Sequence, residues 1–133
     1  MSVIRRIQPE GLFASPAYTH VVTAQSGRTV YISGQVAMDP DGAVVGVGDL
    51  GAQAAQVMRN LEVALGAVGA TFADVVKITT FVVGYQPEHR AVISAARSPY
   101  FTNGGPPAST LIGVAALAAP DWLIEIEAVA VVD

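Results

Sequence analysis

The chain contains no cysteine, and this absence excludes disulfide bonds, thiolate nucleophiles and cysteine-ligated metal sites. Its two histidines, His20 and His89, are not spaced to share a metal ion on one helix or strand. No serine lies in the Gly-x-Ser-x-Gly motif that places a nucleophile on a sharp turn. We therefore expect no resident metal or cofactor and no conventional nucleophilic triad.

Charge is also scarce. Charged residues make up 14% of the chain, the net charge is -4, and Lys and Arg form no run. Nucleic-acid-binding proteins normally carry a basic stripe that displaces counterions, so neither DNA nor RNA is an expected partner. No apolar run approaches the ~18 residues of a membrane span, and no stretch of signal-peptide length follows Arg5 and Arg6. We expect a cytoplasmic protein that does not bind membranes.

Apolar residues, in contrast, account for 52% of the 133 residues. A chain of this length forms one domain, here residues 1–133, whose large surface has to be covered by polar groups. Because so few charged side chains are present, part of this surface is expected to be covered by other copies of the chain. The composition thus predicts a homo-oligomer.

Strand and helix patterns alternate along the chain. Strands are predicted near residues 3–7, 18–25, 28–36 and 75–84, followed by two more between 104 and 133. Ser26 and Gly27 predict a hairpin between the second and third of these strands. Apolar residues spaced three and four apart predict a helix over 50–68. A shorter helix is predicted over 88–98, with its inward face formed by Val92, Ala95 and Ala96.

The predicted order is therefore β-β-β-α-β-α-β-β, an α+β fold with a mixed sheet and both helices on one face. Gly46, Gly48 and Gly51 have the spacing of a dinucleotide-binding loop, but Asp49 within it would repel a phosphate. We interpret Asp49 as the N-cap of the first helix instead.

The last strand carries two carboxylates. Alternation places Ile124, Ile126, Ala128 and Ala130 on one face, and Glu125 and Glu127 on the other. For Glu127, a solvated or edge face and a more specific role remain equally open. For Glu125, we favour a cleft or subunit interface that needs an acid.

Several segments resemble the RidA/YjgF family of reactive-intermediate (imine) deaminases. They are PPAST, GVAAL and EIEAVAV near the C-terminus, and upstream Tyr18-Thr19-His20-Val21-Val22, Ser33-Gly34-Gln35 and the strand 75–83. The resemblance covers nearly the whole chain in the right order. It implies a YjgF/chorismate-mutase-like fold and a homotrimer with small-molecule clefts between adjacent subunits.

The resemblance also implies which residues form the cleft. The family's tyrosine corresponds to Tyr18, its Ser-Gly backbone to Ser33 and Gly34, and its glutamate, which positions the attacking water, to Glu125. The family's arginine, which grips the substrate carboxylate directly after Pro-Ala, corresponds to Ser109. A hydroxyl offers one neutral hydrogen bond where a guanidinium offers a charged, bidentate one.

This departure leads to the expectation of a neutral substrate, held by Ser109, Thr110 and the Gly34 backbone. Two arginines, Arg90 and Arg97, lie on the second predicted helix, and nothing in their spacing brings either to Ser109. Ser94 and Arg97 also stand where the family's usual Asn and Tyr are expected.

Three functions are compatible with these residues. The first is a hydrolase that deaminates a small imine or enamine, with Glu125 activating a water. The alternative is a non-catalytic trimer that binds a small ligand or a protein. A ribonuclease is the weakest candidate because the chain is acidic and has no histidine pair. Whether His20 lines the cleft beside Tyr18 is left open.

Overall fold

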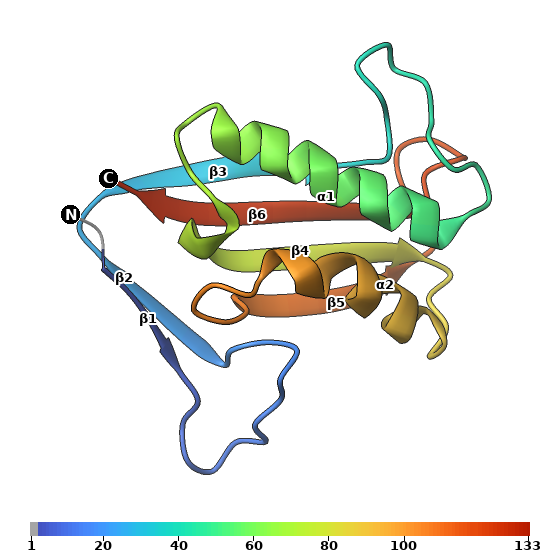
Figure 1. The fold of residues 1–133 in the computed structure, drawn as a ribbon. Helices are drawn as coiled ribbons and strands as arrows, with labels where there is room; N and C mark the ends of the chain where they lie inside the picture. Colours follow the sequence, from blue (N-terminus) through green and yellow to red (C-terminus); the bar gives the residue numbers. More distant parts are fainter. Residues whose placement is uncertain (1–2) are drawn as a thin grey trace.

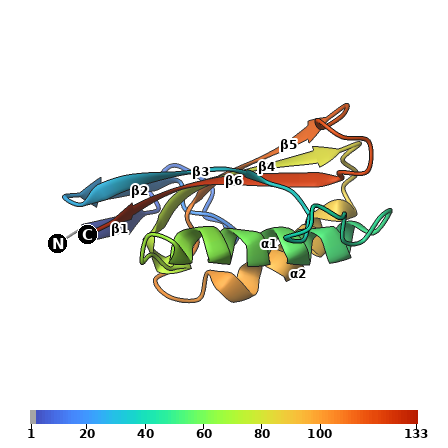
Figure 2. The same ribbon diagram turned by 90° about the horizontal axis from the view of Figure 1, so that it is seen from above.

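A computed structural model describes residues 3–133 and shows one main sheet with two helices on one face. The sheet order is β3 (Arg28–Gln35), β6 (Ile124–Val132), β4 (Val75–Val83) and β5 (Ala108–Val114). β6 is antiparallel to both of its neighbours, whereas β4 and β5 are parallel. The helices are α1 (Leu50–Gly66) and α2 (His89–Arg97), and both lie below the sheet in Figure 2. The predicted α+β fold class and element order are confirmed.

A second, two-stranded sheet extends away from the main one (Figure 1). It pairs β1 (Val3–Ile7) with β2 (Val21–Gln25) in antiparallel register. Ser26 and Gly27 form the predicted turn, with φ of 63° and 94°. The predicted hairpin between β2 and β3 is nevertheless wrong, because β3 pairs with β6 and β2 pairs with β1. The turn directs β2 out of the main sheet and toward β4.

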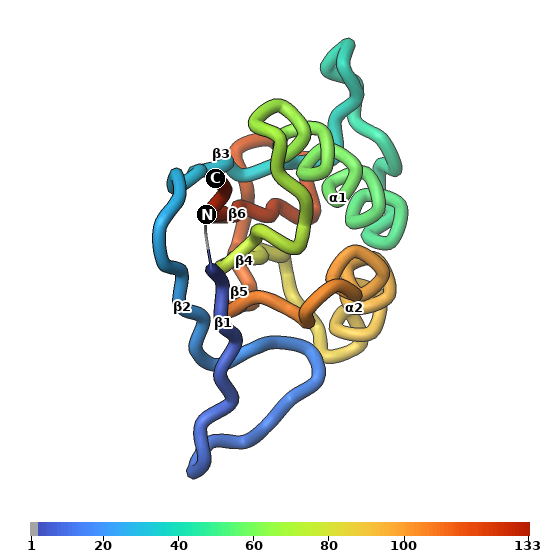
Figure 3. Tube along the Cα trace, turned by 60° about the vertical axis from the view of Figure 1, so that its left-hand side comes forward, coloured from blue at the N-terminus to red at the C-terminus, as the bar shows by residue number. Residues whose placement is uncertain are grey.

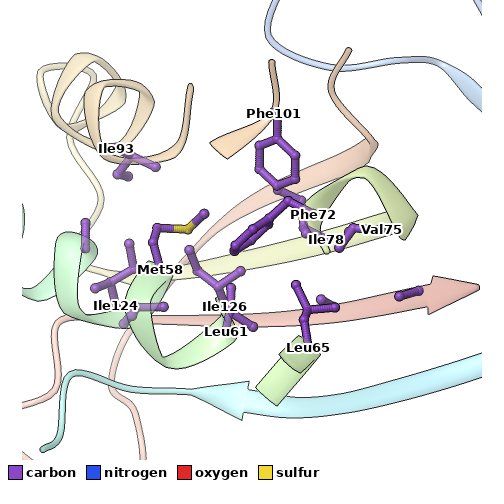
Figure 4. Close-up of a cluster of buried hydrophobic side chains, with 14 of the residues drawn as sticks. Met58, Leu61, Leu65, Phe72, Val75, Ile78, Ile93, Phe101, Ile124 and Ile126 are labelled. Carbon is purple, nitrogen blue, oxygen red and sulfur yellow. The ribbon is translucent and has the colours of Figure 1, made fainter. Parts of the chain in front are cut away.

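The core lies between α1 and the helix-facing side of the sheet (Figure 4). The α1 stripe buries Met58, Leu61 and Leu65, each 1% exposed. The face of β6 that faces them consists of the predicted alternating residues Ile124, Ile126, Ala128 and Ala130, all buried. Two further β-branched side chains from β4, Ile78 and Val82, complete this layer. Truncating one of the large core residues to Ala would cost roughly 2–5 kcal/mol.

Two polar side chains fix the start of α1. Asp49 accepts a hydrogen bond from the Ala52 amide at 3.0 Å, which confirms its interpretation as the N-cap. Gln53 is fully buried and satisfies its amide with three backbone groups, at Gly46, Asp121 and Leu123. These bonds join the helix to the loop that enters β6.

Helix α2 faces the sheet differently from the prediction. Its buried residue is Ile93, at 2% exposure, while Val92 is 38% exposed and Ala95 is also exposed. Of the three predicted inward residues, Ala96 packs against the core. The inward face is thus rotated by one residue, about 100° around the helix axis. Because positions three before and four after Ile93 lie on the same side, Arg90 and Arg97 share this face.

The segment between β1 and β2 lies beside the chain entering β5 (Figure 3). Thr19 donates its amide to the Pro107 carbonyl at 3.1 Å and its hydroxyl to the Pro106 carbonyl at 2.6 Å. The Gln8 side chain donates to the carbonyl of Tyr18 at 2.9 Å. These bonds hold Tyr18 next to the start of β5.

Candidate functional site

A cavity of about 430 Å³ lies between α2, the start of β5 and the segment that carries Tyr18. This volume is in the range of small-molecule sites. Polar lining is contributed by Tyr18, Tyr85, Arg90, Ser94, Arg97, Ser98 and Ser109. Within residues 3–133, no acidic side chain lines the cavity.

The cavity contains a largely buried guanidinium. Nη2 of Arg97 donates to Oγ of Ser109 at 3.2 Å. Its Nε is buried and has no hydrogen-bond partner within the described part of the chain. Burial lowers the pKa of Arg97 to about 10, so the side chain stays charged at neutral pH. A buried cation with an unused donor and no acidic neighbour in the cavity is suited to bind an anion.

The expectation that neither arginine reaches Ser109 is therefore wrong for Arg97. The predicted inward face of α2 is one residue out of phase with the observed one, and that phase turns Arg97 away from Ser109. Because Ile93 is the buried residue, Arg97, one helical turn further along, points toward β5 and contacts Ser109. The position where the resemblance places an arginine is thus occupied by a serine that contacts an arginine from the helix.

Glu125 lies on the opposite side of the sheet. In the register, Ile78 of β4 is next to Ser109, and Phe81 is next to Glu125. Ile78 is buried under the helices. Phe81 is three positions further along β4, an odd offset, so its side chain points to the other face. Ser109 therefore faces the helices, whereas Glu125 faces away from them, and one chain alone does not bring the two together.

Gly34 and Ser33 lie with Glu125. The β3–β6 register shifts between Ile32 and Gln35, so both residues fall in a bulge-like irregularity. A Cβ atom on Gly34 would overlap the Glu125 carboxylate, so only glycine permits this close approach. Ser33 is exposed beside them.

The remaining candidates lie outside the cavity. Thr110 is exposed on the outer face, where its hydroxyl accepts from Nζ of Lys77 at 2.7 Å. The Nε2 atom of His20 lies 2.6 Å from the Phe13 carbonyl, and its ring packs edge-on against Tyr18. His20 does not line the cavity. The predicted residues thus form two groups: Tyr18 and Ser109 in the cavity, and Ser33, Gly34, Thr110 and Glu125 on the outer face.

Two further observations concern metal ions and membranes. Within residues 3–133, no three His, Asp or Glu side chains gather in a way that could hold a metal ion. In the same part of the chain, no helix is long and apolar enough to cross a membrane.

Comparisons with known proteins agree with the fold. The family model described as Endoribonuclease L-PSP matches residues 10–132. The 2-iminobutanoate/2-iminopropanoate deaminase of Rattus norvegicus is 34% identical over 132 residues, which cover 98% of this chain and 92% of that protein. Protein DfrA of Myxococcus xanthus is 36% identical over 114 residues, 86% of this chain and 84% of that protein.

Solved structures of similar proteins give the same result. YyfB of Yersinia pestis, described as a protein of unknown function of the conserved Rid protein family, has a TM-score of 0.93 at 44% identity, with 97% of this chain and 98% of that chain covered. The YjgF gene product of E. coli has a TM-score of 0.70 at 35% identity, with 82% and 84% covered. The chain belongs to the RidA/YjgF family, to which the Endoribonuclease L-PSP model and these Rid structures assign it.

Proposed function

We propose that the chain, acting as one domain, is a homotrimeric hydrolase that releases ammonia from a small imine or enamine carrying a carboxylate. The observation that supports an anionic substrate is the Arg97 guanidinium, 3.2 Å from Ser109. It places a cation where the resemblance implies a carboxylate clamp. Relatives named as imine deaminases support the reaction class.

The Arg97 side chain is suited to this role energetically. A hydrogen bond to a charged group contributes about 1.5–3 kcal/mol, or roughly one to two decades in affinity. The substrate carboxylate would also neutralise a charge whose burial lowers the pKa of Arg97 to about 10. Binding of the carboxylate would thus offset part of the free energy that it costs to bury the Arg97 guanidinium away from water.

The site is proposed to be completed by a second copy of the chain. The outer face of the sheet carries apolar side chains without a helix over them, among them Tyr31 at 81% and Ile112 at 38% exposure. Glu125 and Gly34 lie on the same face. A neighbouring subunit packed against this face would bring its own cavity opposite Glu125, in agreement with the inter-subunit clefts that the family resemblance implies.

In the proposed reaction, Glu125 of one subunit accepts a proton from a water molecule, whose oxygen attacks the imine carbon. Glu125 returns this proton to the imine nitrogen, which gives a carbinolamine. The hydroxyl proton of the carbinolamine then moves to the nitrogen as the carbon–nitrogen bond breaks, and ammonia leaves. The product is the corresponding carbonyl compound. Arg97 and Ser109 of the adjacent subunit hold the carboxylate, and the Tyr18 phenol lines the same cavity.

Mixed trimers test this division of roles. Arg97→Gln and Glu125→Gln subunits are each expected to be inactive as homotrimers in an assay of ammonia release from 2-imino acids. When the two are refolded or expressed together, mixed trimers contain an intact Arg97–Glu125 site across one interface, so activity should return. Absence of recovery, with mixed trimers demonstrated by mass, would show that the site is not shared between subunits.

The same assay separates the enzyme from a non-catalytic trimer. A binding protein would retain carboxylate binding in calorimetry while releasing no ammonia from any imine in the panel. Light scattering at micromolar concentration checks the assembly, because a monomer of 13.7 kDa would contradict the shared site.

A further inference from the structure

The cavity contains a second arginine, Arg90, in addition to the proposed carboxylate ligand. Arg90, Ser94 and Arg97 occupy positions i, i+4 and i+7 of α2, so they lie along one face of the helix. Their spacing separates the two arginine Cα atoms by roughly 10 Å along the helix axis. Arg97 is largely buried at the Ser109 end, whereas Arg90 is exposed at the other.

The local charge contrasts with that of the whole protein. The chain has a net charge of -4, yet this cavity is lined by two arginine residues and, within residues 3–133, by no acidic residue. One substrate carboxylate at Arg97 would leave the charge of Arg90 unbalanced. Two cationic side chains along one small cavity favour a ligand with two negative groups.

The surface between the two arginines is mainly apolar, with one hydroxyl at Ser94. Ile93 lies on α2 between them and Leu111 lies two residues beyond Ser109 on β5, and both line the cavity. Phe101 contributes an aromatic wall. Such a surface accommodates a hydrocarbon chain, and only the Ser94 hydroxyl lies between the two arginines along the helix.

We infer that the cavity selects substrates with acidic groups at both ends, such as the imine or enamine of a dicarboxylic acid. Arg97 and Ser109 bind one carboxylate, Arg90 binds the other, and the carbon chain lies on Ile93 and Leu111. The substrate class rests on the proposed hydrolysis, but the selection of dianions does not.

A competing role for Arg90 is an ion pair with Glu125 of an adjacent copy. In that case, its loss would reduce turnover equally for substrates with one or two carboxylates. If Arg90 binds the distal carboxylate, its loss would affect only the second class. The ratio between the two classes therefore distinguishes the roles.

Binding is measured first, by calorimetry of the intact oligomer with unreactive acids. The probes are glutarate and adipate as dicarboxylates, and butyrate and valerate as monocarboxylates. We expect the dicarboxylates to bind at least about tenfold more tightly, since they gain one further charged hydrogen bond. Arg90→Gln should abolish this preference and leave butyrate binding unchanged, whereas Arg97→Gln should weaken both classes by about ten- to a hundredfold. Arg59→Gln, on the exposed side of α1, is the matched control.

Equal affinity for the two classes in the parent protein, or equal losses for both in Arg90→Gln, would overturn the inference. Ammonia release from monocarboxylic and dicarboxylic imines then tests the reaction. A dicarboxylate preference in binding without any turnover would contradict the proposed hydrolysis and leave the inference intact. Turnover of both imine classes with equal kcat/KM, unaffected by Arg90→Gln, would contradict the inference and leave the hydrolysis intact.

Discussion

The two faces of the main sheet hold different parts of the proposed chemistry. The helix-side cavity has two arginines and three serine hydroxyls, at Ser94, Ser98 and Ser109, and within residues 3–133 no carboxylate lines it. The outer face has Glu125 and Glu127, with Gly34 in contact with the first. In one chain the sheet separates the cationic groups from the acid that would activate water.

Under the proposed function, this separation would make binding and catalysis independent functions of the two faces. The cavity would bind an anion without Glu125, and Glu125 would act on that anion only with a second copy of the chain. If both carboxylate and guanidinium lay in one pocket of one chain, they would pair with each other and neutralise the site. Keeping them on opposite faces leaves Arg97 available until subunits and substrate meet.

The largest effect is expected from a substitution on the outer face alone. Glu125→Gln removes the proton acceptor while preserving size, so kcat for ammonia release should fall by about 10²–10⁴-fold. Glutarate affinity should not fall, because the arginines and Ser109 of the cavity are unchanged. Glu127→Gln, exposed two residues further along the same face, is the control and should retain turnover. Equal losses in the two variants would mean that Glu125 has no special role.

Gly34→Ala should also impair the outer face, by displacing the acid instead of removing it. The added Cβ would overlap the Glu125 side chain and force it to move. A displacement of about 1 Å at a catalytic group can cost roughly a hundredfold in rate. Ser33→Ala, at the exposed neighbouring position, should have little effect. Full turnover in Gly34→Ala would show that the carboxylate position is not critical.

The outer face was predictable from the sequence because strand alternation has a period of two. Once Ile124 and Ile126 are assigned to the core, Glu125 and Glu127 have to point the other way. The proximity of Glu125 to Gly34 could be expected only from the family resemblance, because the β3–β6 pairing joins segments far apart in the chain. The pairing of β2 with β1 was not predictable from the Ser26–Gly27 turn, because a local turn does not determine which sheet the strand joins.

The cavity was harder to predict because a short helix has an ambiguous phase. Apolar residues occupy two adjacent stripes of α2, and the small side chain of Ala95 gives little energetic preference for burial. Ile93 has the most apolar surface to bury and determines the orientation. Weighting residues by size would have placed Arg90 and Arg97, three before and four after Ile93, on the buried side.

A third prediction concerns pH on the cavity side. Burial lowers the pKa of Arg97 to about 10, so its guanidinium is protonated from pH 7 to 9 and loses its proton as the pH rises through 10. Butyrate affinity should therefore be constant up to about pH 9 and fall roughly tenfold above pH 10, where one charged hydrogen bond is lost. The profile is measured in a Tyr18→Phe, Tyr85→Phe background, which leaves no phenol among the residues that line the cavity.

In Arg97→Gln, the affinity should be low at every pH in this range, and the decline near pH 10 should disappear. Persistence of the decline in this variant would assign it to another group.

The smallest expected effect is that of Ser109→Arg in the otherwise unchanged protein. If the cavity lacked a clamp, the new guanidinium would raise turnover on imino acids about ten- to a hundredfold. Because Arg97 already contacts Ser109, the two like charges would instead repel each other in a confined space, and we expect a gain of no more than about twofold. The same substitution placed in Arg97→Gln is expected to restore about tenfold of the lost affinity for butyrate, since the clamp then returns from β5. A large gain in the single variant, or no rescue in the double variant, would show that Arg97 does not take the place of the family's arginine.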